Sequence, residues 1–229
     1  MSPMPYYVSP EQLMKDRADY ARKGIARGKS IIAIECAAGI IFVAENPSVS
    51  LHKVSELYDR VAFCAVGKYN EFENLRVAGV RLADLRGFSY GREDVTARAI
   101  ANAYAQALGT IFTQEMKPFE VELLVAQLGS EQATDELYHV LYDGSVTDEQ
   151  GFVAMGGQAD ALTAGLNESY QESLSFDDAL RLGANALAAG DTSRTLEAQN
   201  LEVAVLDRAR PRRAFRRMPD PDVERILSA

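Results

Sequence analysis

The sequence has few of the residues that hold a protein together covalently or ligate a structural metal. It contains two cysteines, Cys36 and Cys64, and two histidines, His52 and His139. Two cysteines are too few for a disulfide scaffold or a structural zinc site. Neither histidine lies at a metal-ligand spacing from the other or from a cysteine. We therefore expect no metal and no cofactor, with both cysteines packed in the core as small hydrophobic residues.

Long apolar runs and an excess of positive charge are also missing. The longest apolar runs span about six to eight residues, whereas a membrane helix needs about 20. The opening residues MSPMPYY do not have the basic and apolar pattern of a signal peptide. A net charge of -9 argues against a general nucleic-acid binder. These absences predict a cytoplasmic protein with neither membrane nor nucleic acid as a partner.

The chain contains enough apolar residues for a sizeable core. Its 229 residues are 47% hydrophobic, so it can fold without a disulfide or a metal. Residues 1–8 show no periodic pattern, and Ser9 and Pro10 then form a typical helix start, with Gln12 at the capping-box position. We therefore expect one domain over residues 9–229, preceded by a separate short segment. Gly24 is the expected end of this first helix.

Helices and strands are predicted in groups rather than in alternation. Strands are expected at Ser30–Cys36, Gly39–Glu45, Arg60–Val66, Phe119–Leu128, Leu137–Tyr142, Phe152–Met155, Leu201–Leu206 and Ala214–Met218, and further helices at about Tyr69–Leu85, Glu93–Thr113, Asp160–Glu172 and Ser175–Ala189. Pairs of helices thus separate groups of mostly hairpin-linked strands, unlike a doubly wound fold. The order fits an α+β protein with two antiparallel sheets and a helix pair on each outer face.

Two local motifs invite a functional reading that we consider weaker than a structural one. Arg208–Arg217 holds six arginines in ten residues, which suits either a nucleic-acid patch or an edge strand with ion pairs. Pro211 and the position of Phe215 favour the edge strand. The pair Gly156 and Gly157 lacks the remaining residues of a phosphate loop and is better explained as a turn between strand and helix.

Ser30 raises the alternative of an N-terminal nucleophile hydrolase. Such enzymes carry Ser, Thr or Cys at the mature start of a strand and use their own α-amine as the base. Ser30 begins the first predicted strand, but 29 residues precede it, including a well-capped helix. A processed hydrolase and an unrelated soluble α/β enzyme or scaffold both remain as alternatives at this point.

Several longer motifs decide among these readings. They are Tyr7–Gln12 (YVSPEQ), Ala21–Arg27 (ARKGIAR), Phe42–Ser48 (FVAENPS), Ser55–Arg60 (SELYDR), Ala65–Phe72 (AVGKYNEF), Gly109–Thr113 (GTIFT) and Pro211–Arg217 (PRRAFRR). Together they make the chain, from about Tyr6 to Met218, resemble the α subunits of the bacterial, actinobacterial-type 20S proteasome.

The resemblance implies a fold, an assembly and a division of labour. The fold is the four-layer αββα sandwich of the Ntn-hydrolases, in which two sheets lie between two helical layers. Seven α subunits form a ring that caps the rings of catalytic β subunits. The α subunit is not proteolytic: it gates the entrance for protein substrates and docks a ring ATPase or another activator. In these bacteria the family degrades proteins tagged with a small ubiquitin-like modifier.

The resemblance also assigns roles to particular residues. Lys53 and Arg27 correspond to a basic pocket between neighbouring α subunits, which receives activator C-termini ending in a hydrophobic-Tyr-x motif. Glu45 and Lys53 lie near the places of a catalytic Asp and Lys, but without the nucleophile they are inert in hydrolysis. The expected gate is the segment Ser2, Pro3, Met4, Pro5, Tyr6, Tyr7 and Val8.

Overall fold

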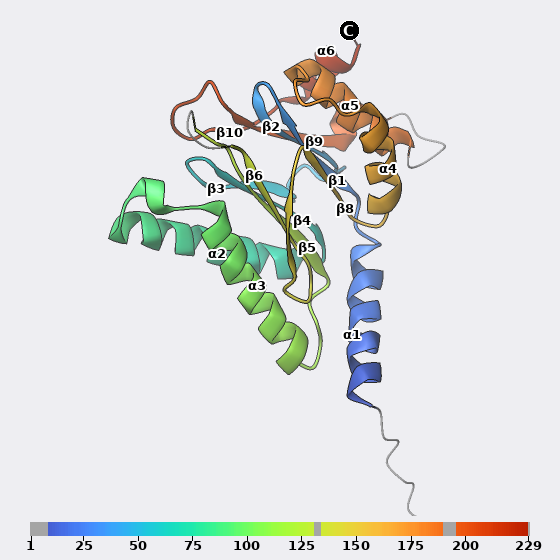
Figure 1. Cartoon of the computed structure of the whole chain (residues 1–229). Coiled ribbons are helices and arrows are strands. Elements are labelled where there is room, and N and C mark those ends of the chain that lie inside the picture. The colour runs from blue at the N-terminus through green and yellow to red at the C-terminus, as the bar shows by residue number, and fades with distance from the viewer. Residues whose placement is uncertain (1–8, 131–133, 190–195, 229) are drawn as a thin grey trace, which may run out of the picture.

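A computed structural model describes residues 9–130, 134–189 and 196–228. Two five-stranded antiparallel sheets lie between helices, so the chain forms an αββα sandwich, as predicted (Figure 1). The first sheet has the order β10-β9-β2-β1-β8. Its strands are β1 (Ile31–Cys36), β2 (Gly39–Glu45), β8 (Phe152–Met155), β9 (Leu201–Asp207) and β10 (Phe215–Arg217).

The second sheet has the order β3-β4-β5-β6-β7, with every neighbouring pair antiparallel. Its strands are β3 (Val54–Tyr58), β4 (Val61–Gly67), β5 (Val121–Gln127), β6 (Glu136–Val140) and β7 (Val146–Glu149). The connection from β2 to β3 therefore passes from an inner strand of one sheet to the edge of the other.

A pair of helices covers the outer face of each sheet. Helices α2 (Tyr69–Ser89) and α3 (Ala97–Gln114) pack on the second sheet, and α4 (Ala159–Ser169) and α5 (Phe176–Ala189) pack on the first. The short helix α6 (Asp220–Ser228) lies beside α5, and two 3-10 turns span Arg92–Asp94 and Ala198–Asn200. Among the residues that the structure describes, no helix has the length and apolar content needed to cross a bilayer.

Helix α1 (Pro10–Ile25) stands outside these layers, at one end of the sandwich (Figure 1). Ser9 caps it as expected, accepting a hydrogen bond from the backbone N–H of Gln12 at 3.2 Å. The side chain of Gln12 instead donates to Asp16 at 2.7 Å, so the reciprocal half of a capping box is not formed.

Gly24 does not end the helix, contrary to the prediction. Helix α1 continues to Ile25, and the following Ala26 keeps a right-handed conformation. The glycine serves a close approach instead: a Cβ at this position would lie 2.1 Å from Oε2 of Glu120. Packing against β5, rather than a left-handed cap, accounts for the small residue.

Three apolar clusters hold the layers together. One fills the space between the sheets and includes Phe42, Leu124 and Leu206, all fully buried. The other two lie between each sheet and its helix pair. Cys36 and Cys64 are buried, and burial raises the pKa of both thiols, so they act as core residues as expected.

The two strands that the sequence did not predict, β3 and β7, are the edges of the second sheet. In β7 the side chains of Val146, Thr147 and Asp148 are exposed. The strand therefore lacks the alternating apolar pattern by which a strand is predicted from sequence. The predicted helix Glu93–Thr113 begins later, at Ala97, because Thr96 caps it by accepting from the N–H of Ala99 at 3.3 Å.

Candidate functional site

The candidate site lies at the connection between the first sheet and the second. Residues 46–53 form a loop between the end of β2 and the start of β3, and Lys53 is its last residue. This loop therefore bridges the two sheets, and its C-terminal end is fixed by the pairing of Val54 with Cys64 on β4. Lys53 therefore lies directly beside a paired strand residue, and not at the tip of the loop.

The Lys53 ammonium meets the turn that follows α1. Its Nζ donates to the backbone carbonyl of Lys29 at 2.6 Å. The side chain of Lys29 in turn pairs with Glu45, with 2.8 Å between Nζ and Oε1. Lys53, Lys29 and Glu45 thus come from three separate segments and form one charged cluster.

Burial lowers the pKa of Lys53 to about 8. Glu202 and Glu45 partly oppose this by favouring the charged form, whereas Lys29 adds to the lowering. At neutral pH the side chain is mostly protonated, yet it is far easier to deprotonate than an ordinary lysine. Such a cation can be neutralised well by an incoming carboxylate.

Arg27 lies in the same turn, between α1 and β1. It is exposed, and its backbone N–H donates to the carbonyl of Gly24 at 3.3 Å. Only Gly28 separates it from Lys29 in the sequence, so the Cα atoms of Arg27 and Lys29 are within about 7 Å. The fold therefore brings the backbone of Arg27 close to the carbonyl of Lys29 that Lys53 contacts.

Ser30 is not arranged as an N-terminal nucleophile. It is buried, its carbonyl accepts from the N–H of Glu45 at 3.2 Å, and the chain continues on its N-terminal side through Lys29 to α1. The backbone of Gly156 packs against it, since a Cβ there would lie 3.2 Å from Ser30 Oγ. In the intact chain Ser30 therefore has no free α-amine to serve as its base.

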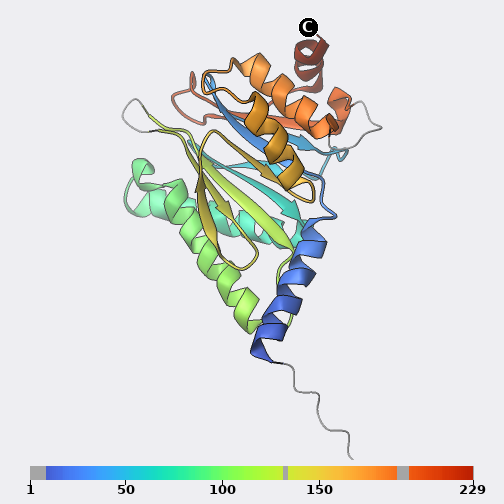
Figure 2. The same cartoon turned by 45° about the vertical axis from the view of Figure 1, so that its right-hand side comes forward.

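Helix α1 closes the sandwich next to Ser30. Ala21 and Ile25 are buried and belong to the cluster between the two sheets. In the middle of the helix, Arg17 donates to the carbonyls of Ile111 and Glu115 at the end of α3, which Figure 2 shows beside α1. Its guanidinium also lies 5.8 Å from the ring centroid of Phe112. The helix is thus anchored at its middle and along its C-terminal half.

The arginine run at residues 208–217 and the glycine pair at 156 and 157 have structural roles. Four of the six arginines in residues 208–217 form ion pairs: Arg208 with Asp135, Arg213 with Glu56, Arg216 with Asp207 and Arg217 with Glu202. The ion-pair interpretation of this run is confirmed. Gly156, with a φ of +105°, makes the expected turn from β8 to α4.

Both histidines contact carboxylates. His139 Nε2 lies 2.7 Å from Glu122 Oε1, and His52 Nδ1 lies 3.6 Å from Glu202 Oε1. Within residues 9–130, 134–189 and 196–228, no group of three or more His, Cys, Asp and Glu side chains is arranged to hold a metal ion. The gate segment, Ser2 to Val8, lies outside the described residues.

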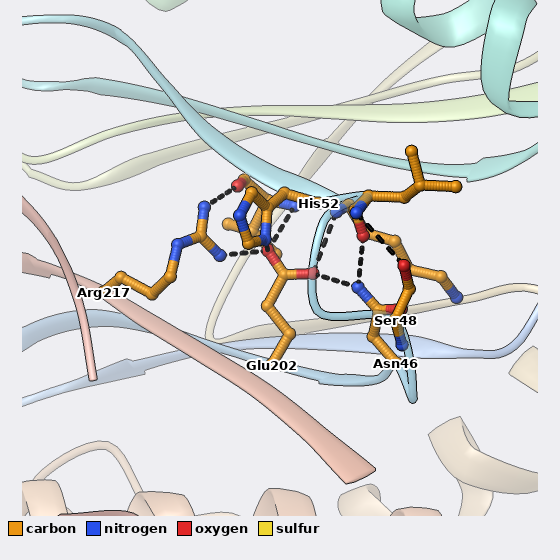
Figure 3. A network of polar contacts seen from close by, with 8 residues as sticks. Asn46, Ser48, His52, Glu202 and Arg217 are labelled. Atoms are coloured by element: carbon orange, nitrogen blue, oxygen red, sulfur yellow. Dashed lines mark hydrogen bonds and ion pairs between the residues drawn. The ribbon is translucent and has the colours of Figure 1, made fainter. Parts of the chain in front are cut away.

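Sequence reasoning missed the residues that hold the Lys53 loop. Figure 3 shows Glu202 between Arg217 on one side and Asn46 on the other. Glu202 is buried on β9, a strand that otherwise reads as apolar. Within the predicted strand Leu201–Leu206, Glu202 is the one charged residue, and this is the signal that could have drawn attention to it.

Comparison with known proteins agrees with this geometry. The family model described as "Proteasome subunit" matches residues 25–206. A protein of Thermomonospora curvata named "Proteasome subunit alpha" is 59% identical over 225 residues, covering 98% of each chain. Proteins of the same name from Xylanimonas cellulosilytica and Kineococcus radiotolerans are 62% and 61% identical, and cover 94% and 98% of this chain and 92% and 98% of their own length.

The αββα sandwich is that of a proteasome-type subunit. Helix α1 precedes the first strand, so Ser30 is not placed as an N-terminal nucleophile. The chain belongs to the proteasome subunit family. Within that family its relatives are α subunits, so it is not the proteolytic subunit of the complex. The reading as an unrelated protein is excluded, and the α-subunit relatives argue against the reading of Ser30 as the nucleophile of a processed hydrolase.

Proposed function

We propose that this chain forms the seven-membered outer ring of a 20S proteasome core particle, where it gates substrate entry and docks activator C-termini. Its partners are neighbouring α subunits, the catalytic β subunits, and a ring ATPase or similar activator in the cytoplasm. The proteins that pass the pore include those marked by a small ubiquitin-like modifier. The observation that carries the docking part is the Lys53 ammonium, held at the junction of two sheets and the turn after α1.

The docking role follows from the chemistry of a C-terminal carboxylate. Such a group needs a cation that is already oriented. The Lys53 ammonium contacts the turn after α1, and Arg27 lies in that turn. At about 4 Å and an effective dielectric constant near 20, one charge pair is worth about 4 kcal/mol before desolvation. A single tail therefore binds weakly in net terms. Several tails on one ring gain affinity because the later contacts are intramolecular.

The gate role falls on the segment Ser2, Pro3, Met4, Pro5, Tyr6, Tyr7 and Val8. These residues come directly before Ser9, which caps the firmly anchored helix α1. We propose that seven copies converge on the axis of the ring and close it. Residues 9–229 then form the single domain that carries the gate.

The docking proposal is tested by replacing Lys53 with alanine in particles that also contain the β subunits. We expect the ratio of activator-stimulated to basal peptide hydrolysis to fall to about one, because the tails lose their cation. Lys15→Ala, which removes an exposed lysine on α1, is the matched control and keeps the wild-type ratio. A Lys53→Ala particle that is stimulated like wild type contradicts the docking role.

A further inference from the structure

We propose that Glu202 is the positioning residue for docking: its carboxylate fixes the loop of residues 46–53 and thereby presents the Lys53 ammonium. The inference rests on the docking function proposed above. Glu202 lies on β9, opposite Ala44 of the neighbouring strand β2, and its side chain is 5% exposed. It makes no contact with an incoming carboxylate itself.

Both oxygens of Glu202 are used to hold the loop. Oε2 accepts from the backbone N–H of Lys53 at 2.9 Å and from Nδ2 of Asn46 at 2.7 Å. Oε1 accepts from the N–H of Val54 at 3.1 Å and from the guanidinium of Arg217. The carboxylate, which Figure 3 shows beside Asn46, thus joins this first residue of the loop to the last one, Lys53.

Asn46 also makes hydrogen bonds with residues in the middle of the loop. Its Nδ2 also donates to the carbonyl of Leu51 at 2.7 Å, and its Oδ1 accepts from the N–H of Ser48 at 3.1 Å. Ser48 Oγ accepts in turn from the N–H of Leu51 at 3.1 Å. The loop is therefore folded around the amide of Asn46, and Glu202 anchors that amide to the sheet (Figure 3).

Arg217 holds the end of the loop from a second side. Besides pairing with Glu202, it donates through Nη2 to the carbonyl of Val54 at 2.7 Å. The peptide unit on each side of Val54 is therefore tied down, one by the carboxylate and one by the guanidinium. Because Lys53 directly precedes Val54, its backbone has little freedom to rotate.

The site requires a carboxylate rather than an amide. All four groups that point at Glu202 within hydrogen-bond distance are N–H donors, from Asn46, Lys53, Val54 and Arg217. A glutamine would present its NH2 group to two of these donors. Those two N–H groups would then face N–H groups of the amide and have no acceptor. A buried donor without an acceptor is costly, so the loop would shift to relieve it.

Glu202 also influences the charge of Lys53. The charged groups that act on the Lys53 ammonium are Glu202 from β9, Glu45 from the end of β2 and Lys29 from the turn after α1. Arg217 and His52 face Glu202 rather than Lys53. Because Glu202 favours the protonated form of Lys53, removing its charge lowers the pKa of Lys53 below about 8.

The test uses particles assembled with the β subunits and a short synthetic peptide that ends in Leu-Tyr-Ala with a free carboxylate. Binding of this peptide is measured as a function of pH for wild type, Glu202→Gln, Glu122→Gln and Lys53→Ala. Glu122 is the matched control, since as whole residues Glu122 and Glu202 are equally buried, each 7% exposed. Glu122 is also hydrogen-bonded, but it contacts His139 and Gly156 instead of the loop. The same peptide with an amidated C-terminus measures binding that does not need the carboxylate.

We expect Glu202→Gln to weaken binding of the free-carboxylate peptide by about tenfold at neutral pH, and to move the pH midpoint of binding downward. Glu122→Gln keeps both the affinity and the midpoint of wild type. If Glu202→Gln does not assemble, Asn46→Ala takes its place. It loosens the loop but keeps the Glu202 charge, so it weakens binding without moving the midpoint.

Each contrary result has a separate meaning. If Lys53→Ala loses binding while Glu202→Gln binds like wild type, the positioning role is wrong and the docking role stands. If Lys53→Ala binds like wild type, the docking function itself is wrong. If Glu122→Gln loses as much affinity as Glu202→Gln, the loss reflects general destabilisation, and the proposal is overturned.

Discussion

The ammonium of Lys53 lies 2.6 Å from the carbonyl oxygen of Lys29, which lies in the turn between α1 and β1. This contact joins the loop before β3 to the turn that connects α1 with β1. An ammonium has three N–H donors, so one can hold the carbonyl while others meet a carboxylate. The docking surface, the helix before it and both sheets are thereby linked through one side chain.

Docking should weaken as the pH rises through about 8. The pKa of Lys53 is about 8 because burial disfavours its charge, and only the protonated form attracts a carboxylate. The peptide carboxylate is already ionised throughout this range, so its own titration does not contribute. We expect the affinity to be constant below about 8 and to fall about tenfold per pH unit well above it.

Lys53→Arg provides the control for this pH dependence. An arginine stays charged at all accessible pH values. Particles with Lys53→Arg that still bind the peptide should bind it equally on both sides of pH 8. A wild-type affinity that does not change across pH 8 would mean that Lys53 is not the cation that receives the tail.

Arg17 should determine how firmly the first turns of α1 are held. Arg17→Ala removes two hydrogen bonds to the end of α3 and the stacking on Phe112. We expect a loss of about 1 kcal/mol in local stability, seen as roughly fivefold faster amide exchange near the start of α1. Lys15→Ala, on the same helix, should leave the exchange rates unchanged. Equal rates in the two variants would show that packing of Ala21 and Ile25 alone anchors the helix.

Deletion of residues 2–8 should raise the hydrolysis of short peptides by the complete particle. Seven copies of the segment are expected to obstruct the pore, and their removal lets peptides enter without an activator. Hydrolysis of peptides by wild-type and truncated particles at equal concentration measures this directly. Unchanged turnover, with intact assembly, would mean that this segment does not close the pore.

Much of the fold could be predicted from the chain because its inner strands are plainly apolar. Strands β2 and β8 lie at the predicted residues, and β9 and β10 form the expected hairpin. The edge strands β3 and β7 were missed, since an edge exposed to solvent does not need an apolar pattern. Gly24 was misread because its reason lies in Glu120, almost a hundred residues away in sequence.

The site was predicted only in part, and through resemblance rather than pattern. Lys53 and Arg27 carry no local signal, and only the family motifs pointed to them. Arg217 was expected only to form an ion pair within its arginine run. Glu202 and Asn46 escaped notice because their link arises from folding, since 156 residues separate them in the sequence. A buried carboxylate in an apolar strand indicates a buried partner, but the sequence does not say which one.

The central claim is that this chain builds a ring on proteasomal β subunits without being processed at Ser30. Native mass spectrometry of the chain co-expressed with its β partner tests this most directly. We expect a particle of about 28 subunits, four rings of seven, in which this chain retains the residues before Ser30. A small species that lacks β subunits, or a chain shortened to begin at Ser30, would contradict the account.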